Sequence, residues 1–568
     1  MISLIIYLLT FLAPILGKTT PELNRLMAQA SPENKITVIV HMNMEYPYER
    51  MADLNATQRG TIMREVAFNS QREVFDWLRT LPREEAETGG QYWIFNGFHL
   101  KATRDVIETL AQRDDVWFIC ENGVVRLPSE EPGEPHPAVA EWNIHKVMAD
   151  SCWQAGYSGD SVIMGFVDTG VMIDHEALNG KWLSPYWLDA VNGQSTPYDD
   201  QGHGTAVAGV ACGGDGPGPF ANDIGVAYGA KIIPTKAFDA GGSGWYLTID
   251  SCLQYLADLR TSGVALRVLN NSWGSGGTDL HWWTIMLNFK TIGVLPACAV
   301  GGSGPGSGTI AVPASYPTVI GSGTTDASDN ISSFSSRGPA PDQNPWNDST
   351  YWYYPSWDLL KPDVSAPGVS IRTSYNDGGY VNYSGASFAV PHVTGGAALF
   401  CDKDSTLTVA DLYYLFRAYC DEPSQGAPYP NMNYGWGRIN LWRGLQAVTG
   451  IDEGETDQRA DAELGLTVYP TVSRGHFQIA YRSSKGQSAP LRGAGASFQD
   501  FQTKSIELKI FDISGRLIKS FTLGPMPLAP CIFWSGDDDM GRVIPAGAYF
   551  VVLAWDGKRL VNKVIISR

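Results

Sequence analysis

Three short stretches of the sequence carry polar residues that could act together in catalysis. Asp168 ends the apolar run in FVDTGV, His203 stands between two glycines in QGHGTAVAGVA, and Ser387 follows a small residue in YSGASFAVPHVTGG. A serine becomes a nucleophile when a histidine takes its proton and a carboxylate orients the imidazolium. Each residue alone also has an ordinary interpretation, as a turn cap or a helix cap. Together they predict a nucleophilic Asp-His-Ser triad.

The surrounding elements must bring these side chains together. Between residues 140 and 450, the runs VIMGFVD, AKIIPTKAF, LRVLNNSW and GVLPACAV lack polar alternation, which is typical of parallel strands covered on both faces. WYLTIDSCLQYLADLRTSG has the character of a helix between two of them. Functional groups of open α/β sheets collect at the carboxyl ends of the strands, where Asp168 stands. We therefore expect an α/β domain over residues 140–450.

Aspartate, histidine and serine follow one another in the chain order of the subtilisin arrangement. DTG, GHGT and SGASFAVPHVTG match the three active-site motifs of that family, and NNSWG, PASYPTVIGSG, SFSSRGP and KPDVSAPG match further stretches in order. Over about 300 central residues the chain thus resembles the subtilisin-like serine proteases, the subtilases. The resemblance implies a seven-stranded, mostly parallel sheet between helices, and an endopeptidase that cleaves polypeptides without a cofactor.

The chain departs from the family where the oxyanion should be stabilised. The family has an asparagine whose side-chain amide donates to the oxyanion, whereas Gly302 stands at that position here. Ala386 also replaces the usual threonine before Ser387. Loss of one oxyanion donor typically lowers turnover roughly 100- to 1,000-fold. The backbone N–H of Ser387 would remain as a donor, and Ser303, a loop amide or an ordered water could complete the site. Ala206 replaces a common family histidine in the helix after His203.

Two segments align with the family's substrate-binding edge strands, between which an extended peptide adds its own backbone. The candidate residues are Gly242, Ser243 and Gly244 on one edge, and Ser272, Trp273 and Gly274 on the other. Ala311 aligns near the floor of the primary specificity pocket. A small residue there leaves space for a sizeable apolar or aromatic side chain. The glycine-rich run of residues 298–311 is not a dinucleotide-binding motif, because Pro313 follows where a helix should begin.

The flanks of this domain predict two further domains. Residues 35–127 have a β-α-β-α-β pattern, with room for two strands in the middle, that suits a ferredoxin-like plait. This part resembles the subtilase propeptide, which assists folding and inhibits the enzyme until removal, so the proline-rich PSEEPGEPHP is the expected processing region. Residues 464–568 alternate like a small β-sandwich. They resemble the sorting domains of bacterial proteins exported by the type IX pathway, although an ordinary surface-adhesion sandwich is the alternative.

Composition limits the classes of function. The 568-residue chain has a net charge of −18 and a pI near 4.9, which argues against nucleic acid as a partner. Residues 1–17 form an apolar segment that is typical of a secretory signal peptide, with an N-terminal membrane anchor as the alternative. We therefore expect a bacterial protein that is secreted or held at the cell surface, with the export machinery as a partner of its C-terminal domain.

Metal sites and disulfides are weakly indicated. Calcium is common in the family, but the candidate acids Asp174, Asp199 and Asp200 make no recognisable ligand set, so acidic turns are the preferred interpretation. The eight scattered cysteines exclude CxxC zinc motifs, and Cys401 with Cys420 is a plausible pair. The aromatic insert at residues 345–357 could extend a peptide groove or cover an apolar patch beside the C-terminal domain.

Three functions remain in view from the sequence. The first is an active secreted endopeptidase, attenuated by an incomplete oxyanion hole. The second is a degenerate protease that binds extended peptides, and the third is a cell-surface scaffold that keeps only the fold. The complete triad favours the first.

Overall fold

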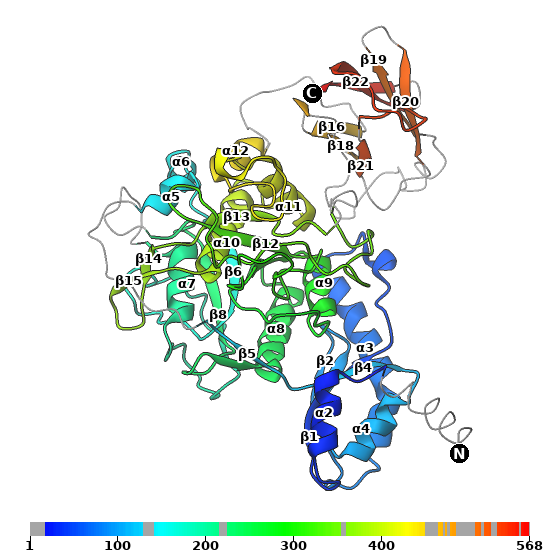
Figure 1. The fold of residues 1–568 in the computed structure, drawn as a ribbon, viewed down its shortest axis with the longest axis vertical. Coiled ribbons are helices and arrows are strands. Elements are labelled where there is room, and N and C mark those ends of the chain that lie inside the picture. The colour runs from blue at the N-terminus through cyan, green and yellow to red at the C-terminus, as the bar shows by residue number, and fades with distance from the viewer. Residues whose placement is uncertain are drawn as a thin grey trace, which may run out of the picture. The chain divides into compact units, whose positions relative to one another are not determined.

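A computed structural model of the chain divides it into two units, residues 1–450 and residues 451–568 (Figure 1). The ranges described are 17–128, 141–214, 224–353, 359–448, 464–469, 472–473, 477–483, 506–512, 516–523, 531–534, 536–555 and 558–566. The predicted signal segment at 1–17 and the predicted processing region at 128–137 lie almost wholly outside these ranges. No helix within the ranges is both long and apolar enough to cross a membrane.

The N-terminal part of the first unit is an antiparallel sheet in the order β2-β3-β1-β4 with helices packed on it. Its elements are α2 Pro21–Gln29, β1 Ile36–Met42, α3 Ala56–Leu78, β2 Ala86–Tyr92, β3 Gly97–Ala102, α4 Arg104–Ala111, β4 Val116–Glu121 and β5 Val124–Arg126. Asn55 begins α3 with a capping box in which its side chain accepts from the amide of Gln58. One face of the sheet packs on these helices through Val38, Val40 and Ile119.

Two stretches that look continuous in the sequence are each divided. QYWIFNGFHLKAT contains the end of β2, a turn and all of β3, and VWFICENGVV contains β4 and then β5. β5 leaves the first sheet and pairs antiparallel with β9, Ser243–Trp245. Gly123, between the two strands, lets the Tyr246 ring approach closely, because a Cβ there would lie 2.6 Å from that ring. The alternation of apolar and polar residues therefore predicts a strand, but it does not predict which strand pairs with it.

The centre of the first unit is a seven-stranded sheet in the order β13-β12-β11-β10-β6-β8-β7, with parallel pairing throughout the described strands. The strands are β6 Ile163–Asp168, β7 Leu188–Asp189, β8 Lys231–Lys236, β10 Leu266–Asn271, β11 Leu295–Ala299, β12 Ile320–Thr325 and β13 Val364–Pro367, beside a separate hairpin of β14 Ile371–Ser374 and β15 Tyr380–Tyr383. The seven-stranded, parallel sheet implied by the sequence is therefore present.

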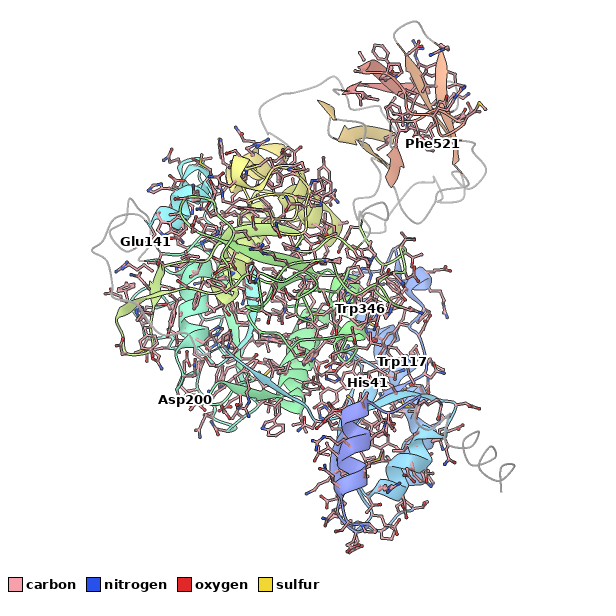
Figure 2. The ribbon with its side chains drawn as sticks, viewed as in Figure 1. His41, Trp117, Glu141, Asp200, Trp346 and Phe521 are labelled. Atoms are coloured by element: carbon pink, nitrogen blue, oxygen red, sulfur yellow. The ribbon has the colours of Figure 1, made fainter. Side chains whose placement is uncertain are left out.

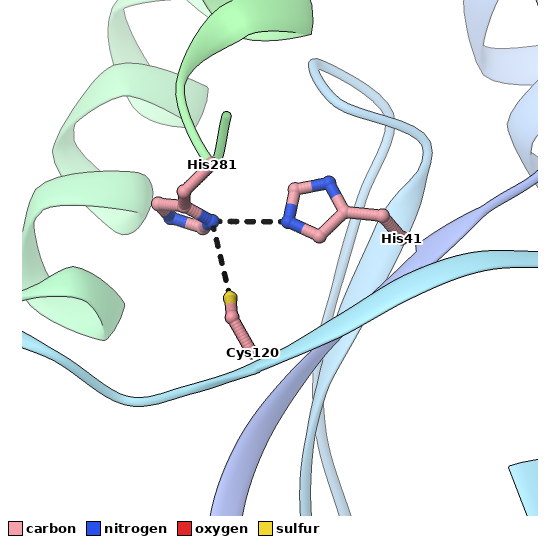
Figure 3. A group of neighbouring side chains, drawn as sticks. All are labelled: His41, Cys120 and His281. Carbon is pink, nitrogen blue, oxygen red and sulfur yellow. Dashed lines mark hydrogen bonds between the residues drawn. The ribbon is translucent and has the colours of Figure 1, made fainter. Parts of the chain in front are cut away.

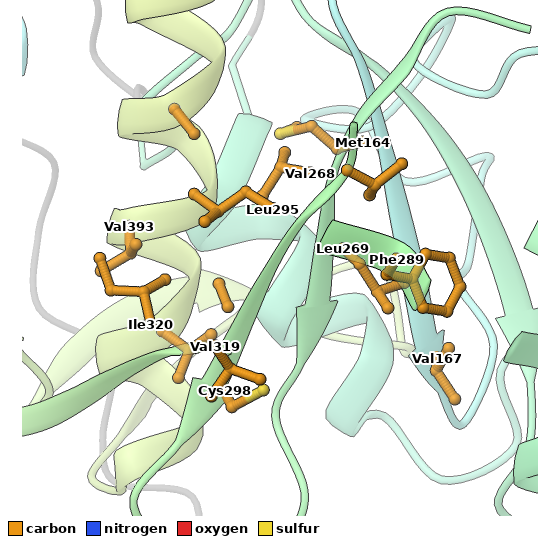
Figure 4. Packing of buried hydrophobic residues seen from close by; sticks show 14 of the residues in the cluster. Met164, Val167, Val268, Leu269, Phe289, Leu295, Cys298, Val319, Ile320 and Val393 are labelled. Carbon is orange, nitrogen blue, oxygen red and sulfur yellow. The ribbon is translucent and has the colours of Figure 1, made fainter. Parts of the chain in front are cut away.

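Helices cover both faces of this sheet. They are α5 Trp142–Lys146, α6 Ala149–Gln154, α7 His203–Cys212, α8 Tyr246–Thr261, α9 Trp283–Thr291, α10 Ala386–Lys403, α11 Val409–Ala418 and α12 Leu441–Ala447. α7 and α10 pack against each other and on the sheet, while α8 and α9 are the crossovers that enter and leave β10. The strands are apolar because side chains on both faces are buried, as Val268, Leu295 and Ile320 are (Figure 4).

The second unit consists of two β-sheets. β16 Leu464–Tyr469, β18 Phe477–Ser483 and β21 Cys531–Trp534 form one, and β17 Val472–Ser473, β23 Lys558–Ile566, β22 Gly547–Trp555, β19 Ile506–Asp512 and β20 Leu517–Leu523 form the other. Ile479 and Trp534 from the first sheet share one apolar core with Leu508 and Val551 from the second. The alternating runs of the sequence therefore correspond to strands of two sheets packed on one another.

Candidate active site

Asp168 is the last residue of β6, the strand at which the sheet order reverses. The chain continues from β6 to β8 on one side, and β10 lies on the other. Such a reversal leaves a crevice at the carboxyl ends of the strands, where ligands of open α/β sheets bind. Asp168 is fully buried. Its Oδ1 accepts hydrogen bonds from the Thr169 amide at 2.8 Å and from His203 Nδ1 at 2.7 Å.

His203 is the first residue of α7, and a carboxylate fixes the start of that helix. Gly202 precedes it with a left-handed φ of 106°. Asp199 accepts from the amides of Gly202 at 2.8 Å and Thr205 at 2.9 Å, so it caps the helix from four residues before His203. Thr169 Oγ1 accepts from the Gly204 amide at 2.8 Å, which ties the helix to the end of β6. These bonds hold the imidazole in front of Asp168.

Ser387 lies in the first turn of α10 and is bonded to the loop after β10. Its Oγ donates to the Ser272 carbonyl at 3.1 Å, and Ser272 Oγ donates to the Ser387 carbonyl at 2.9 Å. The ring of the next residue, Phe388, lies 5.9 Å from the His203 ring. α10 also packs along α7, so the first turn of α10, which carries Ser387, lies near His203.

A buried histidine steadies the helix that carries the nucleophile. His392 Nδ1 bonds to the Phe388 carbonyl at 2.9 Å, and its Nε2 bonds to Asn143 Nδ2 at 2.9 Å. Burial lowers the pKa of His392 to about 4, against a smaller opposing effect of the backbone bonds. His392 is therefore neutral near pH 7, with Nδ1 as its donor.

The position of the family's oxyanion asparagine is an open loop. Gly302 is exposed, and no atom of the described residues other than its chain neighbours lies within 4 Å of where its Cβ would be. The next two amides are already engaged, since Ser303 donates to Ser336 Oγ at 3.0 Å and Gly304 donates to the Phe334 carbonyl at 2.8 Å. Of the donors considered from sequence, the Ser303 amide is thus committed elsewhere.

The first predicted substrate edge is occupied by the chain itself. In the β5–β9 ladder, Arg126 lies opposite Ser243 and Val125 opposite Gly244. The Leu127 amide donates to the Gly242 carbonyl at 2.8 Å, which extends the ladder by one residue. The segment that leads toward the expected processing region therefore lies along this edge as an extended, antiparallel strand.

The second predicted edge and the pocket floor adjoin each other. Ala311 packs against Gly274, because a Cβ on Gly274 would lie 3.1 Å from that of Ala311. Ser275 and Val312 exchange backbone hydrogen bonds at 2.8–2.9 Å beside them. The expected pairing with a peptide uses the backbone of Trp273. Its side chain is buried against Trp282 at 5.0 Å, so only its backbone can serve a peptide.

Several other predictions about this domain change with the structure. In the described part of the aromatic insert, residues 345–353, Trp346 packs into the core, where it is buried beside Trp283 and donates to Ser315 Oγ (Figure 2). Cys401 and Cys420 are both free thiols, so the suggested pair is not formed. Asp199 caps α7, while Asp200 forms an ion pair with the buried Lys236.

Sequence reasoning missed the residues that support the triad. Thr169 and Asp199 hold the two ends of the Asp168–His203 pair, and Lys236 donates to the Thr169 carbonyl at 2.8 Å. Their signal in the sequence was adjacency: Thr169 is part of DTG, and Asp199 stands four residues before His203. Lys236 gave a weaker signal, a charged residue at the end of an apolar strand.

Comparison with known proteins identifies the family. Residues 159–437, which contain Asp168, His203 and Ser387, match the family model of the subtilases. Subtilisin DY of Bacillus licheniformis is 31% identical over 273 residues, which cover 48% of this chain and 88% of that protein. The chain belongs to the subtilase family. Subtilases are serine-type endopeptidases, and the fold and triad geometry described above accord with that membership.

Two further relatives differ in extent. Bacillopeptidase F of Bacillus subtilis is 31% identical over 514 residues, which cover 79% of this subtilase but only 34% of the relative. The chain thus spans about a third of the length of that relative. Thermitase of Thermoactinomyces vulgaris is 27% identical over 322 residues, which cover 99% of it.

Proposed function

We propose that this subtilase is an endopeptidase that hydrolyses peptide bonds through an acyl-enzyme formed on Ser387. The observation that carries the proposal is the 2.7 Å bond between Asp168 and His203 beside the nucleophile helix, at the reversal point of the sheet. A buried carboxylate on Nδ1 fixes the tautomer in which Nε2 is the base. This is the role that a catalytic histidine requires.

The reaction follows from these positions. Ser387 Oγ exchanges its bond to Ser272 for one to His203, then attacks the scissile carbonyl carbon as its proton passes to His203 Nε2. The tetrahedral intermediate expels the amine, which takes that proton, and an ester to Ser387 remains. A water molecule, deprotonated by His203, cleaves the ester and regenerates the hydroxyl.

Polypeptides in extended conformation are the proposed substrates. The edge at Gly242–Gly244 already carries a strand of this chain in antiparallel pairing, which supports backbone pairing as the mode of binding. The segment at Ser272–Gly274 would form the facing edge, and Ala311 would leave space in the pocket between them. Backbone pairing gives affinity with little dependence on sequence, so the pocket would set preference.

The N-terminal part is proposed to act as an inhibitory propeptide with a ferredoxin-like fold. Its β5 covers a substrate edge, and Asn122 Oδ1 accepts from the Leu247 amide at 3.0 Å. Further bonds join α3 to α8, including Arg64 to Asp258 at 2.7 Å. Cleavage in residues 128–140 followed by dissociation would free the edge.

Export is the proposed role of the two ends of the chain. Residues 1–17 would direct secretion from a bacterial cell, and the two-sheet unit at 464–568 would be a sandwich recognised by type IX export machinery. The mature protease would then act outside the cell or at its surface. This proposal rests on the apolar N-terminal run and on the sequence resemblance of the tail.

The open loop at Gly302 favours a second candidate, a degenerate subtilase that binds peptides without efficient cleavage or serves as a surface scaffold. The two candidates separate in one experiment on residues 18–568. Wild type should cut itself near residues 128–140, whereas Ser387→Ala should stay full length, and the exposed Ser328→Ala should behave as wild type. Intact wild type that is folded by circular dichroism would instead support the degenerate protein.

A further inference from the structure

Three side chains with metal-binding atoms converge between the N-terminal part and the protease core. His41 extends from β1, Cys120 from β4, and His281 from the segment before α9 (Figure 3). All three are buried, with at most 2% of their surface exposed. His41 Nε2 lies 3.0 Å from His281 Nδ1, and Cys120 Sγ lies 3.7 Å from the same nitrogen. The three atoms all lie within 4.8 Å of one another.

The two separations from His281 Nδ1 are close to those between ligands of a tetrahedral zinc ion. Zinc bonds of about 2.0–2.1 Å to nitrogen and about 2.3 Å to sulfur place two nitrogens about 3.3 Å apart, and a nitrogen and a sulfur about 3.6 Å apart. We propose that His41, Cys120 and His281 bind a zinc ion that joins the N-terminal part to the protease core. A water molecule would take the fourth position.

The surroundings hold His281 in the orientation that such a site needs. Its Nε2 donates to Asp250, with the two carboxylate oxygens at 2.9 and 3.0 Å, so Nδ1 presents its lone pair to His41 and Cys120. A carboxylate behind a ligating histidine is the usual outer partner in zinc sites. Asp250 is itself held by His99 Nε2 at 3.1 Å. The Tyr246 ring stacks on His281 at 4.7 Å and fixes its plane.

Without metal, the bond between His41 Nε2 and His281 Nδ1 holds one proton, and Cys120 Sγ is bonded to that same His281 nitrogen. His41 Nδ1 is buried and has no partner among the described residues. Zinc accepts electron pairs from all three ligands at once.

The positions of the three ligands would couple zinc binding to the association of the N-terminal part with the core. Two come from the N-terminal part and one from the core, so a complete site exists only while the two are joined. By linkage, zinc would tighten their association by the same factor by which association tightens zinc binding. Under the proposed propeptide function, on which this one consequence rests, zinc would hold the protease in its latent form and chelation would promote release.

The test of the site uses protein that cannot cut itself, so its result is independent of proteolysis. Tag-free residues 18–568 carrying Ser387→Ala are loaded with zinc chloride, dialysed and analysed for metal. We expect one zinc per chain, a loss of roughly ten-fold or more in Cys120→Ala and in His41→Ala, and no loss in Cys152→Ala, which removes another buried cysteine. Asp250→Asn should weaken zinc binding about 10-fold or more through its effect on His281.

A spectroscopic measurement separates ligation from mere folding. Cobalt(II) in place of zinc should give a near-ultraviolet thiolate-to-metal absorption in the Ser387→Ala chain and in Cys152→Ala. That band should vanish in Cys120→His, which keeps a ligand at this position and should therefore retain zinc. Zinc should also raise the unfolding midpoint of the parent chain but not of Cys120→Ala. A parent chain that holds no zinc, or equal zinc in parent and Cys120→Ala, would overturn the proposal.

Discussion

The proton-transfer half and the oxyanion half of the candidate active site differ in how far their groups are buried and hydrogen-bonded. On the proton-transfer side, Asp168, His203 and the start of α7 are buried and bonded to Thr169 and Asp199. On the oxyanion side, the chain presents the exposed Gly302. Preorganised donors are often the largest contribution to such catalysis. Under the proposed function, the difference predicts a complete proton-transfer half beside an oxyanion half that lacks a donor.

The largest change in kcat should come from a substitution in the proton-transfer half. Asp168→Asn keeps the shape but removes the charge that selects the His203 tautomer, so kcat on a peptide substrate should fall roughly 10⁴-fold. Rates are measured after processing in trans, with the exposed Asp174→Asn as the control, which should stay near wild type. A fall of less than about ten-fold would mean that His203 is not the base.

A substitution in the oxyanion half should raise kcat rather than lower it. Gly302→Asn supplies the missing amide donor at a position with space for it, and kcat should rise about 100-fold with little change in KM. Steady-state kinetics measure both constants. Gly306→Asn, at another exposed glycine of the same loop, should change neither. If Gly302→Asn leaves kcat unchanged, another donor already completes the hole and the contrast between the halves disappears.

A smaller effect should come from the carboxylate that fixes the start of α7 in the proton-transfer half. Asp199→Ala removes the carboxylate that caps α7, and should lower the free energy of unfolding by about 1–2 kcal/mol. Denaturant unfolding in the Ser387→Ala background measures it, beside Asp174→Ala, for which less than about 0.5 kcal/mol is expected. An equal loss in free energy of unfolding for both variants would show that the Asp199 cap does not stabilise the fold.

The central strands, and the positions of the three candidate catalytic residues at strand ends and helix starts, could be predicted from the sequence because both depend on local signals. Buried parallel strands are apolar throughout, and the Asp168, His203 and Ser387 motifs stand at the ends of such strands or the starts of helices. The sequence did not predict which segments lie against one another in space. The change of β5 from one sheet to another, and the burial of Trp273, depend on what lies across from them in space. His41 and His281 meet although they are 240 residues apart, which no periodicity reveals.

The bond from Asn122 to the Leu247 amide has a consequence for the order of folding. α8 lacks a side-chain cap of its own, so its first turn is completed by a residue made earlier in the chain. α8 also connects the parallel strands β8 and β10, whose pairing with β6 joins distant segments and is slow to form. Because synthesis runs from the N-terminus, that cap is already waiting when α8 emerges. The N-terminal part, which is synthesised first, thus provides the bond partner for one end of this crossover helix.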